Sequence, residues 1–315
     1  MNTAVVLIIF NRPDLTARVL RAIAQARPRL LLVIADGPRA ASQEETEKCH
    51  KTREVLETVD WPCEVRTNYS FGNMGCRRRV VTGLDWAFSQ VEEAIILEDD
   101  CLPHPCFFSY CDDLLAHYRD DARVMHISGN NFQAAGRSGQ YSYYFSKYVH
   151  AWGWATWKRA WSLYDENTLR WPANRAAGWL SSVCPNVYEA AMWSRYFDNI
   201  HAHRTDTWDT QWMFSCWAQG AMSIVPAVNL VSNIGFRTDA THTKGETTLA
   251  NRPTCDLGPL LHPPTVSPSL VEDLSEFLDV YNGRAFTRRN RLHRRLARFP
   301  ARFITQLFKN IDLWR

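Results

Sequence analysis

A short apolar run, Ala94 to Leu97, is followed at once by three acidic residues, Glu98, Asp99 and Asp100. A run of this length between charged residues is too brief for a helix and predicts a buried parallel strand. Ligands of open α/β sheets bind outside the carboxyl ends of such strands. Carboxylates crowded there repel one another unless a cation or hydrogen-bond donors neutralise them. The pattern favours a divalent cation bound together with a diphosphate, and a solvated acidic turn is an equally good interpretation of the triplet alone.

Strand and helix patterns alternate along residues 1–127 and predict an α/β fold with a doubly wound, mostly parallel sheet. Helices are expected from about residues 14, 76 and 105. After residue 128 the alternation is lost, and ten of the thirteen tryptophans fall between Trp152 and Trp217. The predicted strands are residues 5–10, 30–35, 63–67 (a weaker strand, near an edge), 94–97 and 124–127.

The charge of the chain is unevenly distributed. Residues 284–315 contain ten Lys and Arg and one acidic residue, so the rest of the chain has 26 basic and 32 acidic residues. An acidic body argues against a nucleic-acid-binding protein. Apolar residues recur in the tail at three- and four-residue steps, which predicts a basic amphipathic helix interrupted at Pro300. Such a tail would dock on an anionic membrane, or alternatively pack its apolar face on the body.

Two features of the sequence bear on its location. The nine cysteines are an odd number without a CxxC pair, which favours a reduced chain. No charged and apolar leader precedes the first strand, and no stretch approaches 18 apolar residues. We therefore expect a cytoplasmic protein, either with the tail as a peripheral contact to the inner face of the membrane or with the tail packed on the body.

Polar side chains follow two other predicted strands. Arg12 comes after the first strand and is suited to holding a phosphate or nucleotide through a bidentate contact. Asp36 comes after the second and could accept hydrogen bonds from a nucleobase or ribose. Arg77 begins a run of three arginines at a predicted helix start, which suits an anion. Taken singly, each of these is more commonly a cap, a turn residue or part of a solvated face.

The second half offers further candidates. Asp209 lies between Trp208 and Trp212, and aromatic neighbours that desolvate a carboxylate suit a general base. Trp154 belongs to a tryptophan-rich segment that could stack on a sugar ring, although such clusters are more often core. His242 is a candidate ligand for a metal or phosphate.

Together these segments resemble nucleotide-sugar-dependent glycosyltransferases of the GT-A fold. Within that fold they are most similar to the N-acetylglucosaminyltransferase I family, and the loop Asn73-x-Gly75 also resembles bacterial family 2 transferases. The segments that carry the resemblance are Phe10-Asn11-Arg12-Pro13, Ala35-Asp36-Gly37, Leu97-Glu98-Asp99-Asp100 with the helix after it, Trp208-Asp209, Gly153-Trp154 and Thr241-His242.

The resemblance implies specific roles for these residues. Asp209 would be the catalytic base, Asp100 and His242 would bind Mn²⁺ or Mg²⁺, and Trp154 and Trp208 would contact the sugar or acceptor. The residues expected to bind the nucleotide-sugar are Arg12, Asp36, Arg77, Glu98 and Asp99. Where the family has a histidine that contacts the nucleobase, this sequence has Arg77.

The expected function is that of an inverting, metal-dependent glycosyltransferase. It would move a sugar from a UDP-sugar, such as UDP-GlcNAc, to a glycan or lipid-linked acceptor in bacterial surface-polysaccharide assembly. A metal-dependent phosphohydrolase or nucleotidyltransferase, or a non-enzymatic carbohydrate-binding protein, remain the alternatives. The expected parts are a nucleotide-sugar-binding half at 1–127, an acceptor-binding half at 128–250, a linker or wrapping segment at 251–283 and the basic tail at 284–315.

Overall fold

The structure is a computed structural model that describes residues 1–40, 42–133, 139–237 and 249–296. Its strands are β1 (Ala4–Ile9), β2 (Leu30–Ala35), β3 (Glu64–Tyr69), β4 (Glu93–Glu98), β5 (Cys101–Pro103), β6 (Val124–Ser128), β7 (Tyr143–Ser146), β8 (Trp154–Trp157), β9 (Met222–Pro226) and β10 (Val231–Asn233). Its helices are α1 (Pro13–Ala26), α2 (Gln43–Glu54), the 3-10 helix η1 (Val55–Thr58), α3 (Cys76–Phe88), α4 (Cys106–His117), α5 (Lys158–Trp161), α6 (Trp171–Ala176), α7 (Leu180–Val183), α8 (Val187–His201), α9 (Asp209–Ala218), α10 (Leu270–Asp279) and α11 (Gly283–Leu296).

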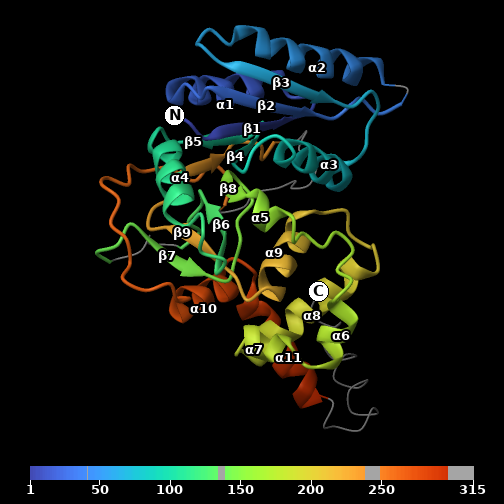
Figure 1. The fold of residues 1–315 in the computed structure, drawn as a ribbon. Coiled ribbons are helices and arrows are strands. Elements are labelled where there is room, and N and C mark those ends of the chain that lie inside the picture. The colour runs from blue at the N-terminus through green and yellow to red at the C-terminus, as the bar shows by residue number, and fades with distance from the viewer. Residues whose placement is uncertain (41, 134–138, 238–248, 297–315) are drawn as a thin grey trace, which may run out of the picture.

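An eight-stranded sheet in the order β3-β2-β1-β4-β8-β6-β9-β7 forms the centre of the molecule (Figure 1). β1 pairs in parallel with β2 and β4, β2 with β3, and β6 with β9, whereas β7 and β8 run antiparallel to their neighbours. One face of the sheet is covered by α1 and α4, and the other by α3 and the tryptophan-rich helices. The predicted α/β class with a mostly parallel, helix-flanked sheet is confirmed.

The parallel strands follow from their composition. Every residue of β1 is buried, as expected of a strand covered by helices on both faces. In β4 the buried apolar run Ala94–Leu97 lies between two half-buried acidic residues, Glu93 and Glu98. β3 alternates exposed and half-buried residues and has a neighbour on one side only, which confirms the predicted edge position.

The second half of the chain adds strands that the sequence pattern did not reveal. β7, β8 and β9 continue the sheet, and β8 lies antiparallel between β4 and β6. These strands are four or five residues long, and all but the first residue of β9 are buried. Tryptophan and tyrosine dominate β7 and β8, so neither strand has the alternation or aliphatic run by which strands are predicted.

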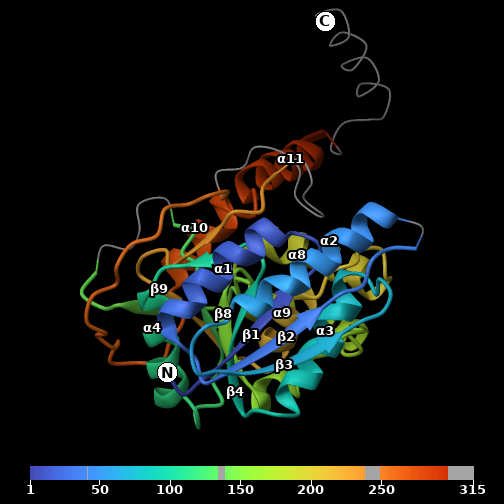
Figure 2. The same cartoon turned by 90° about the horizontal axis from the view of Figure 1, so that it is seen from above.

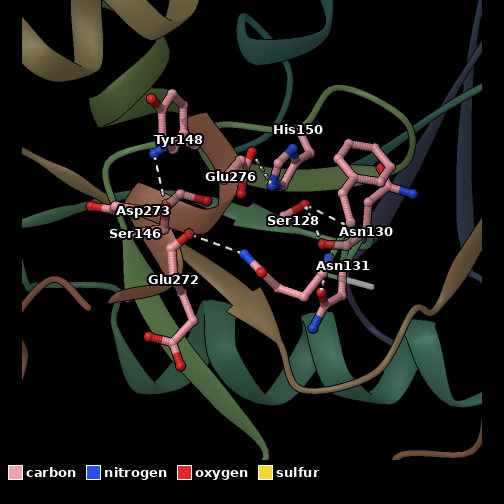
Figure 3. A network of polar contacts seen from close by, with 12 residues as sticks. Ser128, Asn130, Asn131, Ser146, Tyr148, His150, Glu272, Asp273 and Glu276 are labelled. Carbon is pink, nitrogen blue, oxygen red and sulfur yellow. Dashed lines mark hydrogen bonds and ion pairs between the residues drawn. The ribbon is translucent and has the colours of Figure 1, made fainter. Parts of the chain in front are cut away.

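The segment after residue 250 wraps the body and ends in two helices. Leu261 accepts a backbone hydrogen bond from Ser142 at 2.9 Å, next to the strand β7. α10 is then tied to the sheet by buried polar side chains (Figure 3): Ser146 Oγ donates to Asp273 at 2.5 Å, and His150 Nε2 lies 3.2 Å from Glu276 Oε1.

α11 lies against α8 and α10, with the Arg195 guanidinium 5.1 Å above the ring of Phe286. The first turns of the predicted basic tail therefore pack on the body. Pro300 and the rest of the tail lie outside the described residues. Within the described parts of the chain, we find no helix that combines the length and the apolar character needed to cross a bilayer.

Candidate active site

The register of the sheet brings three strand ends together. Ile8 of β1 pairs with Glu98 of β4, and Ile9 pairs with Ala35 of β2. The residues that follow these strands therefore meet at one edge, where they line a cleft of about 960 Å³. Seven of the ten predicted site residues line this cleft: Arg12, Asp36, Glu98, Asp99, Asp100, Trp208 and Asp209.

Arg12 is paired with the acidic triplet. Its Nη1 donates to Asp100 Oδ2 at 2.8 Å and its Nη2 to Asp99 Oδ1, while the Phe10 backbone N–H donates to Asp99 Oδ2 at 3.2 Å. Burial alone would lower the pKa of Arg12, but the charges of Asp99 and Asp100 outweigh it and raise that pKa. In this structure Arg12 is paired with Asp99 and Asp100, a contact that its predicted nucleotide role did not include.

The triplet places three carboxyl groups close to one guanidinium. Burial, reinforced by Asp100 and Asp99, raises the pKa of Glu98. Burial likewise raises the pKa of Asp99, although Arg12 partly opposes the shift. The crowding of three carboxyl groups around one guanidinium therefore favours the protonated forms of Glu98 and Asp99.

A two-stranded ribbon fixes the position of Asp100. β5, directly after the triplet, pairs antiparallel with β10, and the Ile234 N–H donates to the Asp100 carbonyl at 2.9 Å. The chain then passes so close to the carboxylate that a Cβ on Gly235 would lie 2.2 Å from Asp100 Oδ2. Only glycine permits this approach, so Gly235 sets how deeply Asp100 is enclosed.

Asp36 organises a neighbouring loop. Its Oδ1 accepts hydrogen bonds from the backbone of Gly37 at 2.8 Å and of Met74 at 2.9 Å, and its Oδ2 accepts from Asn73 Nδ2 at 3.0 Å. Burial raises the pKa of Asp36, and the two backbone donors partly offset that shift. A Cβ on Gly37 would meet the Gly72 backbone at 2.6 Å, so the two loops are in direct contact.

Asp209 faces the triplet from the other half of the chain. It is the first residue of α9, where helix N–H groups favour a negative charge. Its Oδ1 accepts from the Thr207 hydroxyl and from the Thr210 N–H at 2.7 Å. Among the described residues no hydrogen bond engages Oδ2. An oriented carboxylate with one unengaged oxygen is suited to accept a proton from a bound ligand.

Trp154 does not reach the cleft. It is fully buried in β8, with its ring stacked on Trp208 at 5.5 Å and on His126 at 5.0 Å between centroids. The predicted sugar contact is therefore wrong for Trp154, because core packing covers its ring; Trp208 does line the cleft.

A buried histidine supports this aromatic cluster. His126 Nδ1 accepts from Trp212 Nε1 at 3.1 Å, so its Nε2 carries the proton toward the His150 carbonyl, also at 3.1 Å. Burial, together with the charge of His150, lowers the pKa of His126 to about 3, which keeps it neutral. Because Trp212 belongs to α9, this contact braces the helix that begins with Asp209.

Arg77 lies beside the cleft. Its Nε is 3.6 Å from Asp206 Oδ1, and it is not among the residues that line the cavity. Arg79 lines the cleft instead, with Nε donating to the Ala35 carbonyl at 3.1 Å and Nη2 donating to Asn68 Oδ1 at 2.7 Å. His242 lies outside the described residues.

Sequence reasoning missed several lining residues. Arg79 belongs to the same run of three arginines as Arg77, and Asn73 belongs to the loop that resembles family 2 transferases. Both residues could therefore have been proposed from the sequence. Trp152 and Phe236 also line the cleft, with their rings 5.4 Å apart. Nothing in the sequence pairs these two residues, of which Trp152 precedes β8 and Phe236 follows β10.

No family model and no curated protein matches the sequence of this chain. The crystal structure of S. aureus TarS 1–349 is similar over 50% of this chain, at 11% identity and a TM-score of 0.35; the chain spans about half (47%) of that structure. UDP-glucose pyrophosphorylase complexed with UDP-glucose matches 52% of this chain and 79% of its own, at 9% identity and a TM-score of 0.32. 4-Diphosphocytidyl-2C-methyl-D-erythritol synthase from Anaerococcus prevotii is similar over 70% of this chain and 87% of its own, at 9% identity and a TM-score of 0.36.

Proposed function

We propose that this chain is an inverting glycosyltransferase that uses a nucleotide-sugar of the UDP class. The observation that carries the proposal is the cleft itself. One wall carries Arg12, Asp36 and the acidic triplet on adjacent strand ends, and the other carries Asp209 with an unengaged oxygen. The wall of strand ends suits a nucleoside diphosphate, and the cavity is large enough for a sugar beside it.

In the proposed reaction Asp209 removes the proton from an acceptor hydroxyl. The hydroxyl oxygen forms a bond to the anomeric carbon from the face opposite the nucleotide, and the bond between that carbon and the diphosphate oxygen breaks with its electron pair on the leaving group. A single displacement inverts the anomeric centre and needs one base, without a carboxylate nucleophile.

A divalent ion, Mn²⁺ or Mg²⁺, belongs to the proposal. The surplus carboxylates at the triplet suit it, and Asp100 would hold it together with the phosphate oxygens of the ligand. When bound, it would offset the charge that develops on the departing diphosphate. Within the described residues no ready-made cluster of three or more His, Cys, Asp or Glu is present, so the ligand would have to complete the coordination.

The finer assignment follows from the resemblance of the motifs. We propose a donor such as UDP-GlcNAc and a glycan or lipid-linked acceptor in bacterial surface-polysaccharide assembly. A thermal-shift panel of UDP-, GDP- and CDP-sugars with Mn²⁺ identifies the nucleotide, and acceptor-dependent release of UDP identifies transfer. Rapid turnover without an acceptor would instead indicate a phosphohydrolase, and glycan binding without a nucleotide would indicate a carbohydrate-binding protein.

The role of Asp209 has a direct test. Asp209→Asn should keep donor affinity near that of the wild type and reduce the transfer rate by about 10²–10⁴-fold, the usual contribution of a positioned base. Asp206→Asn is the matched control, since Asp206 lines the same cleft but is paired with Arg77. Loss of donor binding in Asp209→Asn, with the rate at saturating donor retained, would assign Asp209 to the donor site.

A further inference from the structure

The helix α10 exposes its apolar side to solvent. Val271 is 77% exposed, Leu270 65% and Leu274 43%, and Leu278 is half-buried. At helical spacing these four residues fall within an arc of about 100°. Large apolar side chains gathered on one exposed helical stripe mark a contact surface more often than scattered ones do.

A neighbouring side of the same helix is buried and carries two acidic residues. Asp273 and Glu276 are 3% and 1% exposed, and they face Ser146 and His150 beside the sheet (Figure 3). Phe277 is the large apolar side chain that joins them in the interior. These buried contacts fix the rotation of α10 about its axis. The outward position of the leucines is therefore set by the packing of the body.

The next helix is rich in positive charge. α11 contains six arginines and no acidic residue over residues 283–296. It lies next to α10, and both views show the two helices together at one side of the molecule (Figures 1 and 2). Arg284 is paired with Asp279, whereas Arg288 and Arg289 are exposed and make no ion pair within the described part of the chain.

We propose that α10 and α11 together form a docking surface for an anionic lipid bilayer. Leucine and valine side chains on one helical stripe can enter the boundary between head groups and acyl chains. Arginines on the adjacent helix bind lipid phosphates and add attraction to an anionic leaflet. An acidic protein partner would satisfy the arginines, but it would leave the leucine stripe without an apolar counterpart. The inference is independent of the reaction in the cleft.

The test is flotation of the full chain with vesicles of phosphatidylcholine, alone or mixed in equal parts with phosphatidylglycerol. The wild type should float with the anionic vesicles at low salt and much less at high salt, where the attraction is screened. Val271→Glu with Leu274→Glu should weaken binding at least tenfold, and each of Arg288→Gln and Arg289→Gln about fivefold.

The control variant alters two leucines whose exposed fractions are close to those of Val271 and Leu274. Leu169→Glu with Leu163→Glu alters residues that are 74% and 45% exposed and belong to the segment between α5 and α6, and it should leave vesicle binding unchanged. Circular dichroism and the melting temperature verify that each variant folds. Equal flotation of the α10 variant and the wild type overturns the proposal. A wild type that ignores anionic vesicles but forms dimers broken by the α10 substitutions also overturns it, in favour of a self-association surface.

Discussion

At the scale of single residues, the candidate site depends on which charges face each other. Arg12 and the acidic triplet are separated by more than eighty positions in sequence, yet two hydrogen bonds join them. Each was expected to contact ligand, and in this structure they contact one another. Arg12 therefore lies beside the carboxylate to which we assign the proposed divalent cation, and the two cations should compete for Asp100.

This competition predicts that removal of an arginine from the cleft strengthens metal binding. Arg12→Gln should bind Mn²⁺ more tightly than the wild type in the absence of nucleotide, by about tenfold, because Asp99 and Asp100 lose the cation that neutralises them. Isothermal titration calorimetry with the metal alone measures the change.

Arg39→Gln supplies the control for this measurement. Arg39 lines the same cleft, and its charge is paired with Glu45 rather than with the triplet. The substitution removes the same charge and should leave Mn²⁺ affinity nearly unaltered. Equal or weaker metal binding by Arg12→Gln would show that Arg12 does not compete for Asp100.

The sequence predicted the residues at the strand ends better than their contacts. Asp36, Asp100 and Asp209 could be proposed because each follows a recognisable strand or aromatic pattern. Their partners could not, because a pairing such as Gly235 with Asp100 depends on how distant loops meet. Trp154 illustrates the opposite error: a tryptophan suited to stacking on a sugar is equally suited to core packing, and the sequence does not reveal which side of its ring is covered.

At the scale of elements, the helices and strands differ in how they are held. β1, β2 and β4 are specified by aliphatic runs that only a sheet covered on both faces can bury. That is why they were predictable, while β7 and β8 were not. α10 is held in another way, since two of its buried carboxyl groups, Asp273 and Glu276, contact Ser146 of β7 and His150 after that strand. The contribution of α10 packing to the free energy of unfolding should therefore depend on pH.

The pKa of Asp273 is raised from 3.8 to about 6, chiefly by burial and further by Glu276, while Ser146 and Lys147 oppose the shift. Because the folded state binds this proton more tightly than the unfolded state, the stabilisation is complete below about pH 4 and is lost as the pH rises through about 6. Asp273→Asn should abolish that loss, on the order of 3 kcal/mol in unfolding free energy between pH 4 and 7.

Urea denaturation of both proteins at several pH values measures this difference. Asp279→Asn is the control on the same helix, because Asp279 is exposed and paired with Arg284. Wild-type and Asp273→Asn stabilities that change in parallel with pH would show that Asp273 titrates normally in the folded chain.

At the scale of the whole molecule, one sheet joins the two halves that were predicted as separate parts. β8 and β9 come from residues after 128, yet they lie in the same sheet as the strands that carry the triplet. Asp209 and Asp100 are accordingly both held by elements that pack on this one sheet, so the two walls of the cleft should form together when the chain folds.

We therefore expect the chain to unfold in a single transition. Tryptophan fluorescence reports mainly on residues 152–217, where ten of the thirteen tryptophans lie, whereas far-ultraviolet circular dichroism reports on all helices and strands. The two signals should change at the same urea concentration, as two-state unfolding requires. Midpoints that differ would show that the halves unfold as separate units.

The antiparallel placement of β8 also has a consequence for protein synthesis. A ribosome makes β4 well before β8, so the growing chain carries the edge of β4 bare until residue 157 has emerged. An unpaired, apolar edge of this kind recruits strands from other chains. The nascent protein is thus exposed to aggregation at this edge while residues 99–157 are being added, and a pause in translation there would lengthen that exposure.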